Sequence, residues 1–519
     1  MIGPRRESLP KEANMSPWRT AVVVLSIVLV PLAAGAAPAG KVVIAQGVDP
    51  TTLDMMNQQE QPASNVGAQI FESLLERNQS LKLVPTLAAD MPKLVAPTTW
   101  EFKLRRGVKF HNGEDFNADS VKFSIERLVN PANKLRGSTS FAPIDRVEIV
   151  DPYTVKIHTK KPWPVFLSHI ALRQAAMYPP KEHAGKDTAA ISKNPIGTGP
   201  FKFVQWVRDE KLVMEKNPDY WQGAPDLNRV TIRFIPEFSA RLAALLAGEI
   251  DIMKDVPPHT VEMLDKSGKA KVRSTVSSRI NYLALVNLKP GPMQDLRARQ
   301  AIHHAVNVDE LIQQVLKGRA TKMCGSLSPL NVDYSPKGEC IKHDPARAQA
   351  LFKEAGIDPT KLQLTLDTPS GRYPLDKDVS LAIAAQLQRL GIKTNVVANE
   401  WGTHLDKVKN RTTGDMFFLG WGPALEAQGT IEQLFQATPT YSSFGNNKAI
   451  DAKIAQAVTI VDSKKRLEAW AELQQMVRDE VPWVFLWQQH DLYGVANWIE
   501  WTPRADEKVW MYEAKVVAR

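Results

Sequence analysis

The sequence predicts an α/β protein large enough to hold more than one hydrophobic core. Its 519 residues exceed the length at which a single core stops growing, so we expect two or three lobes. Between residues 362 and 419, strand-like and helix-like segments alternate, which is typical of a doubly wound, largely parallel sheet. Residues 194–223 add a hairpin bracketed by glycines and prolines.

The N-terminal residues have the pattern of a secretory signal peptide. Arg19 precedes an apolar stretch that starts at Ala21, is broken by Pro31 and ends in small residues, with a cleavage site near Ala36–Ala39. A membrane anchor is less favoured, because only about ten residues are strongly apolar where a span needs about twenty. We therefore expect residues 1–39 to be removed on export. The true start codon and the choice between Sec and twin-arginine export stay open.

Composition and charge indicate a folded protein that binds no nucleic acid. The chain is 44% apolar and 23% charged, its net charge is +9, and Lys and Arg form no run of five or more. The two cysteines, Cys324 and Cys340, lie in a Gly/Pro/Ser-rich segment without a CxxC motif or a nearby pair of histidines. They favour a structural disulfide worth about 3 kcal/mol over a redox or metal site.

The first elements are predicted from local patterns. Lys41–Ala45 and Trp100–Leu104 have the pattern of strands, a helix is predicted to contain residues 70–75, and Ala118–Leu128 has apolar residues near helical spacing. In the hairpin that follows, residues 201–215 form two alternating runs joined by a charged turn. Two aromatic residues after it are predicted to pack over the strands.

Downstream of the hairpin, capping residues mark further elements. Ser239 is predicted to cap a helix over 240–247 that Gly248 ends, between strands at 230–235 and 250–252. Later, Asn307 with Glu310 caps a helix that ends near Leu316, and a helix from Asp344-Pro345 closes at Gly356. The alternating segments are then predicted in the order strand, helix, strand, helix, strand: 362–367, 379–390, 393–397, 403–409 and 415–419.

Candidate ligand-binding residues follow the strands of this alternating region. Ligands of open α/β sheets bind beyond the carboxyl ends of the strands. The three loops there supply Arg372, Tyr373, Trp401, Trp421 and glycines that permit close backbone approach. An arginine fork suits a carboxylate or phosphate, and an indole face suits an apolar, sugar-like or cationic group.

Each candidate also has a purely structural interpretation. Arg372 could pair with Asp376 or Asp378 on the same loop, and this pairing is slightly favoured. Trp401 could equally be part of the core. Trp421 follows a strand among glycines, where a role in the site is favoured over packing.

Several long stretches resemble one protein family. Residues 194–223, the string FKLRRGVKFHNGEDFNADSVKFSIERL, and Leu53-Asp54 followed by Phe71-Glu72-Ser73-Leu74 are similar to the family 5 (peptide and nickel type) solute-binding proteins of ABC importers. The resemblance covers nearly the whole mature chain. It implies a two-lobed periplasmic binding protein of type II, cluster C-like, with mostly parallel or mixed sheets and an extra inserted domain.

The resemblance also implies domain boundaries. The first lobe would comprise three segments, a smaller domain would be inserted after the first of them, and the second lobe would be continuous, with crossings near Leu288–Pro292 and Leu486–Gln489. The expected boundaries are signal peptide 1–39, first lobe 40–84, inserted domain 85–193, first lobe 194–288, second lobe 289–487 and first lobe 488–519.

The resemblance places further residues at the ligand. The loop after the first strand would put Gln59, Glu60 and Gln61 on the wall of the site, and Gly422 would follow the Gly-Trp motif. In peptide-binding relatives an Asp after that motif pairs with the free α-amino group of the ligand. Here Ala424 occupies its position, and Glu426 could substitute from two residues on. An ordinary free-amine peptide is therefore in doubt, and a modified peptide, an opine, an oligosaccharide or a metal chelate stays open.

The implied function is a monomeric periplasmic receptor that captures a peptide or peptide-like solute between two lobes. It would deliver this solute to the transmembrane subunits of an ABC permease and their ATPase, without a metal or other cofactor. A secreted hydrolase is less favoured, because the sequence contains none of the motifs G-x-S-x-G, HExxH, the Walker loop or GxGxxG. A receptor that feeds a sensor would have the same fold.

Overall fold

The computed structural model describes residue 3 and residues 40–517, except for residues 337, 423, 424, 440 and 446. The predicted cleavage site near Ala36–Ala39 and nearly all of the predicted signal peptide lie outside the described residues, as does Ala424. None of the helices in the described ranges is both long and apolar enough to cross a membrane.

The main sheet has eleven strands in the described part of the chain, and it is mixed rather than largely parallel. Its order is β15-β14-β16-β12-β17-β11-β1-β10-β9-β8, and β13 pairs with β17. Strand β14 is parallel to β15 and β16, and β1 is parallel to β10 and β11. The other pairs are antiparallel. The strands are β1 (Lys41–Gln46), β8 (Phe201–Val207), β9 (Lys211–Lys216), β10 (Arg229–Phe234), β11 (Ile252–Lys254), β12 (Ala270–Leu285), β13 (Ala320–Lys322), β14 (Gln363–Pro369), β15 (Lys393–Asn399), β16 (Met416–Trp421) and β17 (Trp483–Ala496).

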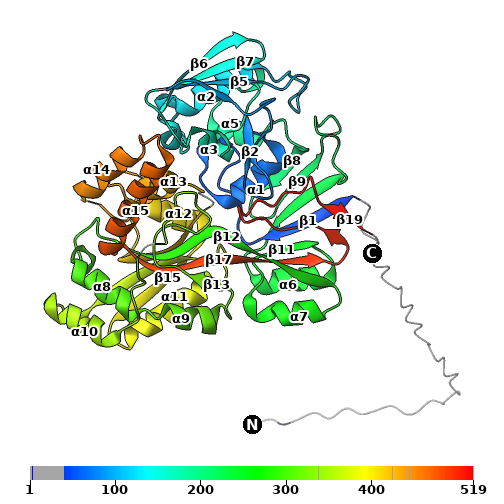
Figure 1. Ribbon diagram of the computed structural model, residues 1–519. Helices are drawn as coiled ribbons and strands as arrows, with labels where there is room; N and C mark the ends of the chain where they lie inside the picture. Colours follow the sequence, from blue (N-terminus) through cyan, green and yellow to red (C-terminus); the bar gives the residue numbers. More distant parts are fainter. Residues whose placement is uncertain are drawn as a thin grey trace, which may run out of the picture. The chain divides into compact units, whose positions relative to one another are not determined.

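Two hydrophobic cores flank this sheet, and strands β12 and β17 connect them. β12 starts in the first core at Ala270 and enters the second at Ile280, and β17 returns from Trp487 to Leu492. The two strands pair along most of their length, with irregular register between Val276 and Ile280. They run side by side across the middle of Figure 1, above α11 on the left and α6 on the right.

Helices cover the sheet around both cores (Figure 1). The first core holds α1 (Gln61–Ile70), α6 (Phe238–Ala247) and α7 (Val261–Lys266). The helices that contribute buried residues to the second core are α8 (Leu296–Ala305), α9 (Val308–Glu310), α10 (Pro345–Glu354), α11 (Asp376–Gln388), α12 (Trp401–Lys409), α13 (Ala427–Phe435), α14 (Lys448–Ala457) and α15 (Ser463–Asp479).

A separate four-stranded antiparallel sheet forms between β3 and β8 in the chain. Its order is β4-β5-β7-β6, and α2 packs on it, as the upper part of Figure 1 shows. Short strand pairs β2-β3 and β18-β19 complete the strands of the described residues. The elements are β2 (Leu75–Arg77), β3 (Leu83–Pro85), β4 (Lys93–Ala96), β5 (Thr99–Lys103), β6 (Ile144–Asp151), β7 (Thr154–Thr159), β18 (Ile499–Glu500), β19 (Lys515–Val516), α2 (Ala118–Val129), α3 (Phe166–Ile170), α4 (Pro180–His183) and α5 (Thr188–Lys193).

The helix predicted to contain residues 70–75 is wrong, because α1 ends at Ile70. Phe71 is extended, and Glu72 lies buried beneath the hairpin. Its carboxylate accepts hydrogen bonds from Thr198 Oγ1, Tyr220 Oη and Trp221 Nε1 at 2.8, 2.9 and 3.0 Å. These three donors come from the segment that begins at Asn194, so contacts distant in the sequence outweigh the local helical pattern.

The predicted cap at Ser239 is also wrong. Helix α6 begins at Phe238, and Glu237 occupies the N-cap position without a capping side-chain hydrogen bond. The start of the helix at Phe238 is stabilised by the side chain of Arg241, which donates a hydrogen bond to the carbonyl of Pro236 at 2.8 Å. The predicted end at Gly248 is confirmed: its φ of 77° is left-handed, a conformation that glycine adopts without strain.

The other capping predictions agree with the structure. The side chain of Asn307 accepts from the N–H of Glu310 at 3.0 Å, and Asp344 caps α10 through the N–H of Arg347 at 2.9 Å. The disulfide predicted from the sequence joins Cys324 and Cys340, whose Cα atoms are 4.6 Å apart.

Candidate functional site

A cavity of about 200 Å³ lies where residues from the two cores meet. The first core side contributes the start of α1, β2, the 169–174 segment and residues 506–508, and the second side contributes β12, α12, β16 and the loops beside them. The nine residues predicted to contact a ligand all lie on the wall of this cavity: Gln59, Glu60, Gln61, Arg372, Tyr373, Trp401, Trp421, Gly422 and Glu426.

Asp376 fixes the loop that carries Arg372. After β14 the chain turns through Gly371, whose φ is 79°, and the Asp376 carboxylate accepts from the backbone N–H groups of Gly371, Arg372 and Tyr373 at 3.1, 2.9 and 3.0 Å. Burial raises the pKa of Asp376 to about 6, although the N–H donors oppose that shift. The predicted ion pair between the Arg372 side chain and Asp376 is therefore wrong, because the Asp376 carboxylate accepts hydrogen bonds from backbone N–H groups instead.

The guanidinium of Arg372 is buried against two aromatic rings. The side chain is 4% exposed, and its Cζ lies 4.6 Å from the ring centre of Tyr373 and 5.2 Å from that of Trp401. Within the described residues Nε has no hydrogen-bond partner, and no carboxylate lies within ion-pair distance of the guanidinium. Arg372 thus presents a desolvated cation with unused donors at the cavity wall.

Glu60 is an anion on the same wall. The Nε1–H of Trp401 donates to Oε2 of Glu60 at 2.6 Å, and Oε1 accepts from the N–H and Oγ1–H of Thr51 at 2.6 and 2.8 Å. The residue is 6% exposed and stands at the N-cap position of α1. No Lys or Arg forms an ion pair with Glu60 in the described ranges. Trp401 itself is both core and wall, since it is 3% exposed.

The space beside the glycines that flank Trp421 is filled by Arg279 and is not open to a ligand. Arg279, on β12, donates to the carbonyls of Gly420 and Gly422 at 2.7 and 3.3 Å. A Cβ at Gly422 would lie 2.8 Å from the Cα of Arg279, so the close backbone approach predicted there is made to Arg279. That arginine is held by Glu507, whose two carboxylate oxygens accept from it at 2.6 and 2.8 Å.

Trp421 and Glu426 also lie on the cavity wall. Trp421 is half-buried, its Nε1–H donates to the carbonyl of Gly429 at 3.2 Å, and its ring lies 5.4 Å from that of Tyr441. Glu426 forms an ion pair with Arg77 at 3.2 Å. Its carboxylate is therefore already partnered, which weakens the expectation that it replaces the amine-binding Asp.

The remaining predicted residues are held by the surrounding chain. Gln59 Nε2 donates to the carbonyl of Arg136 at 3.1 Å, and Gln61 Nε2 donates to Oδ1 of Asn65 at 3.2 Å. The hydroxyl of Tyr373 donates to the carbonyl of Gly420 at 3.1 Å. These contacts orient the side chains before any solute arrives.

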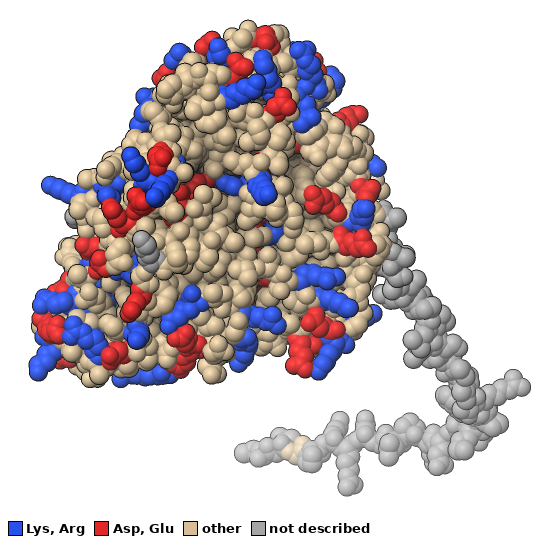
Figure 2. Space-filling model, in the orientation of Figure 1, with Lys and Arg blue, Asp and Glu red and all other residues tan. Residues whose placement is uncertain are grey.

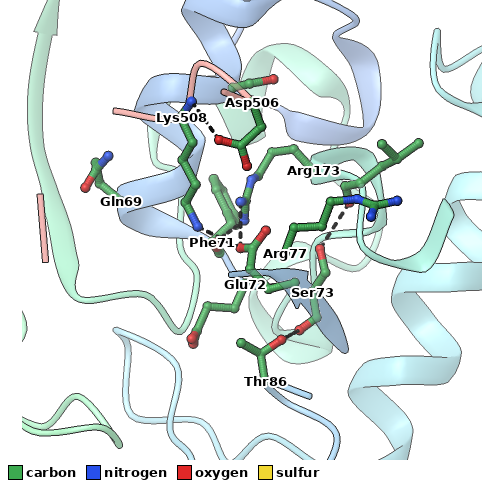
Figure 3. Close-up of polar contacts among 12 residues, drawn as sticks. Gln69, Phe71, Glu72, Ser73, Arg77, Thr86, Arg173, Asp506 and Lys508 are labelled. Atoms are coloured by element: carbon green, nitrogen blue, oxygen red, sulfur yellow. Dashed lines mark hydrogen bonds and ion pairs between the residues drawn. The ribbon is translucent and has the colours of Figure 1, made fainter. Parts of the chain in front are cut away.

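A group of basic residues near β2 was not predicted from the sequence. Arg173 and Lys508 both donate to Oε2 of Glu76, at 2.8 and 3.0 Å, and Figure 3 shows these two cations converging beside Phe71 and Arg77. Burial opposes ionisation of Glu76, but the two cations lower its pKa to about 2. Burial lowers the pKa of Lys508. The partners lie 97 and 432 positions apart, so no local pattern could indicate the cluster.

The charges on the wall are therefore paired, with two exceptions. Arg77, Arg173, Lys508 and Arg279 each contact a carboxylate, whereas Arg372 and Glu60 do not form ion pairs in the described part of the chain. Over the outer face shown in Figure 2, Lys and Arg are interspersed with Asp and Glu. Groups of three or more His, Cys, Asp or Glu suited to a metal were not found among the described residues.

Comparison with known proteins gives consistent matches over nearly the whole chain. The family model described as "Bacterial extracellular solute-binding proteins, family 5 Middle" matches residues 82–442. The glutathione-binding protein GsiB of Pectobacterium atrosepticum is 31% identical over 458 residues, which cover 86% of this chain and 88% of GsiB. GsiB of Escherichia coli O157:H7 is 29% identical over 479 residues, 90% of this chain and 92% of that protein.

Two solved structures extend the comparison to the fold. The periplasmic binding protein DppA of Helicobacter pylori, in complex with the peptide STSA, has a TM-score of 0.86 at 24% identity, covering 92% of this chain and 98% of DppA. AgaA of A. tumefaciens R10, in complex with agropinic acid, has a TM-score of 0.83 at 23% identity, covering 92% and 99% of the respective chains. The expected two-lobed binding-protein fold is confirmed by these similarities.

Proposed function

The chain belongs to family 5 of the bacterial extracellular solute-binding proteins, and from this premise we propose that its cavity receives a small anionic, peptide-like solute of the glutathione class. It is a solute-binding protein of an ABC importer and not an enzyme. The observation that supports the choice of solute is the buried guanidinium of Arg372 on the cavity wall, which forms no ion pair with the residues that the structure describes.

A buried cation without a partner favours an anionic ligand. Removing a guanidinium from water is costly unless a counter-charge or hydrogen-bond acceptor compensates it. A carboxylate matches the arginine fork and can accept two hydrogen bonds from it. Glutathione carries two carboxylates and one ammonium group, so its net charge of about −1 complements this cavity.

The other cations on the wall are less suited to this task. Arg173 and Lys508 share Glu76, Arg77 contacts Glu426, and Arg279 contacts Glu507. A solute carboxylate that approached them would compete with a carboxylate already in place. Arg372 is therefore the residue that we assign to the solute.

The same guanidinium also suits an opine, which is the second candidate class. Such solutes carry carboxylates, and a protein that is similar in fold was solved with agropinic acid. An oligosaccharide is less well supported, because the Trp401 indole already contacts Glu60 through its N–H and Arg372 through its face.

The proposed route runs from export to delivery. After removal of residues 1–39, with cleavage near Ala36–Ala39, the protein acts as a monomer in the periplasm. Two lobes, one built from residues 40–84, 194–288 and 488–519 and the other from 289–487, close over the solute, with residues 85–193 as an inserted domain. The closed form is presented to the ABC permease and its ATPase.

The proposal is tested by thermal stabilisation with a panel of solutes. Glutathione, an opine, a neutral trisaccharide and a nickel–histidine complex are each added to the purified mature protein. A solute that binds the folded state alone stabilises it by about 2.7 kcal/mol at one hundred times its Kd. We expect stabilisation by glutathione without any chemical change of the solute. Stabilisation by the trisaccharide alone, or turnover of glutathione, would overturn the proposal.

A further inference from the structure

Two charges of the cavity wall that form no ion pair within the described part of the chain contact the same side chain. Glu60 accepts a hydrogen bond from the Nε1 edge of Trp401, and the guanidinium of Arg372 lies over the ring face of the same indole. Glu60 comes from the start of α1 and Arg372 from the loop after β14, so the first and second cores each supply one charge. Both residues are more than nine-tenths buried.

These two residues do not neutralise each other directly. An ion pair between Glu60 and Arg372 is not found among the described residues, although both contact Trp401. Both charges lie on the cavity wall and each contacts the same indole, so a solute group with both charges is suited to compensate them. An ammonium beside a carboxylate is such a group, because each charge of the solute compensates one charge of the wall.

Each receptor group has spare capacity for this purpose. A carboxylate can accept about four hydrogen bonds, and Glu60 receives three. The Nε of Arg372 is a buried donor without a partner in the described ranges. Glu60 stands at the N-cap position of α1, a ten-residue helix, and its side chain makes no capping hydrogen bond.

Resting on the proposed function, we propose that Glu60 and Arg372 form a two-charge anchor for a free α-amino-acid group of the solute. Glu60 receives its ammonium and Arg372 its carboxylate, with the Trp401 indole between them. The anchor selects solutes whose free amine and carboxylate share one carbon, as in γ-glutamyl peptides. An α-linked peptide has no free carboxylate on the carbon that bears its free amine, so it cannot place both groups of one carbon on the anchor.

The linkage isomers of one tripeptide test this selection. γ-Glu-Cys-Gly and α-Glu-Cys-Gly have the same composition and charge, and their Kd values are measured by titration calorimetry on the full mature protein. We expect the γ-isomer to bind at least about tenfold more tightly, since the α-isomer loses one charged hydrogen bond. Equal Kd values would overturn the anchor while leaving the proposed function intact. If neither isomer binds, the proposed function and the anchor both fail.

A variant separates recognition by Glu60 from its structural contacts. Glu60→Gln should weaken γ-Glu-Cys-Gly at least about tenfold but should leave N-acetyl-γ-Glu-Cys-Gly, which lacks the ammonium group, nearly unchanged. Thr51→Val is the matched control, because it removes a hydrogen bond to Glu60 without removing the charge. Equal losses for both solutes in Glu60→Gln would show that Glu60 only supports the wall, and the anchor would be rejected.

Discussion

The Nε1 atom of Trp401 lies 2.6 Å from Oε2 of Glu60, although the two residues are 341 positions apart. The hydrogen bond joins α12, which belongs to the second core, to the start of α1, which belongs to the first. A buried carboxylate needs donors of this kind, because an unmet acceptor keeps the full cost of its desolvation. The contact therefore couples the two halves of the cavity wall.

Replacing Trp401 with Phe should destabilise the protein. The variant keeps a large aromatic ring but removes the donor, so we expect the free energy of unfolding to fall by about 1–3 kcal/mol in urea denaturation. Trp421→Phe is the matched control. Its Nε1 bonds a backbone carbonyl at a half-buried position, where water can replace the donor. Equal stability of Trp401→Phe and wild type would contradict the assigned coupling.

Replacing Trp421 with Ala should weaken solute binding with little loss of stability. The indole is half-buried on the cavity wall and packs against Tyr441, so its removal opens the wall without emptying the core. We expect a higher Kd for glutathione in calorimetry and a melting temperature within a few degrees of wild type. Trp206→Ala, a half-buried indole on β8 outside this cavity, should leave the Kd unchanged. An unchanged Kd in Trp421→Ala would argue against its assignment.

The ion pair between Arg279 and Glu507 should contribute strongly to stability. Arg279→Met leaves a buried carboxylate without its cation, which costs about 3–5 kcal/mol. Burial opposes ionisation, yet Arg279 holds the pKa of Glu507 well below its ordinary value of 4.5. The stabilisation is therefore present above pH 4.5 and lost as the pH falls below it.

The check is a series of denaturant titrations from pH 3 to pH 7. Wild type should lose stability from this pair at the acid end, and Arg279→Met should not. Arg279→Met combined with Glu507→Gln should recover part of the loss at pH 7, because no charge is then stranded. A single variant as stable as wild type at pH 7 would refute the role of the pair.

Glu72 should give the opposite pH dependence. Burial raises its pKa to about 7, against the lowering effect of Thr198, Trp221 and Tyr220. The folded state then retains a proton that the unfolded state releases, so stability falls by on the order of 3 kcal/mol as the pH rises from about 4.5 to about 7. Glu72→Gln should remove the part of this slope that Glu72 contributes, whereas Glu262→Gln, at an exposed position, should leave the slope unchanged. A free energy of unfolding that changes in the same way between pH 4.5 and pH 7 in wild type and in Glu72→Gln would contradict the burial of a proton at Glu72.

Local pattern was sufficient where neighbouring residues decide the structure. The hairpin predicted over residues 201–215 appears as β8 and β9, and Asn307, Asp344 and Gly248 act at helix ends as predicted. Residues at the carboxyl ends of β14, β15 and β16 were predicted to converge, and they share one cavity. Loops that follow neighbouring strands in an α/β sheet lie beyond the carboxyl ends of those strands, so the pattern of strands predicts that these loops lie close together.

Distant contacts account for what the sequence did not indicate. Glu72 leaves the helical pattern because its partners come from the 194–223 stretch. Arg173 and Lys508 both contact Glu76, from positions that are 97 and 432 residues away from it. Arg372 was predicted to pair with a neighbouring carboxylate, but Asp376 is occupied by backbone N–H groups. That competition leaves the guanidinium without an ion pair in the described residues.

Calorimetric titration of Arg372→Met with glutathione tests the central claim most directly. We predict a Kd about 10–100-fold above that of wild type, because one charged hydrogen-bonding group to the solute is lost. Without solute, the variant should be about as stable as wild type, since it removes a buried cation that forms no ion pair within the described residues. A Kd equal to that of wild type would contradict the assignment of Arg372 to the solute carboxylate.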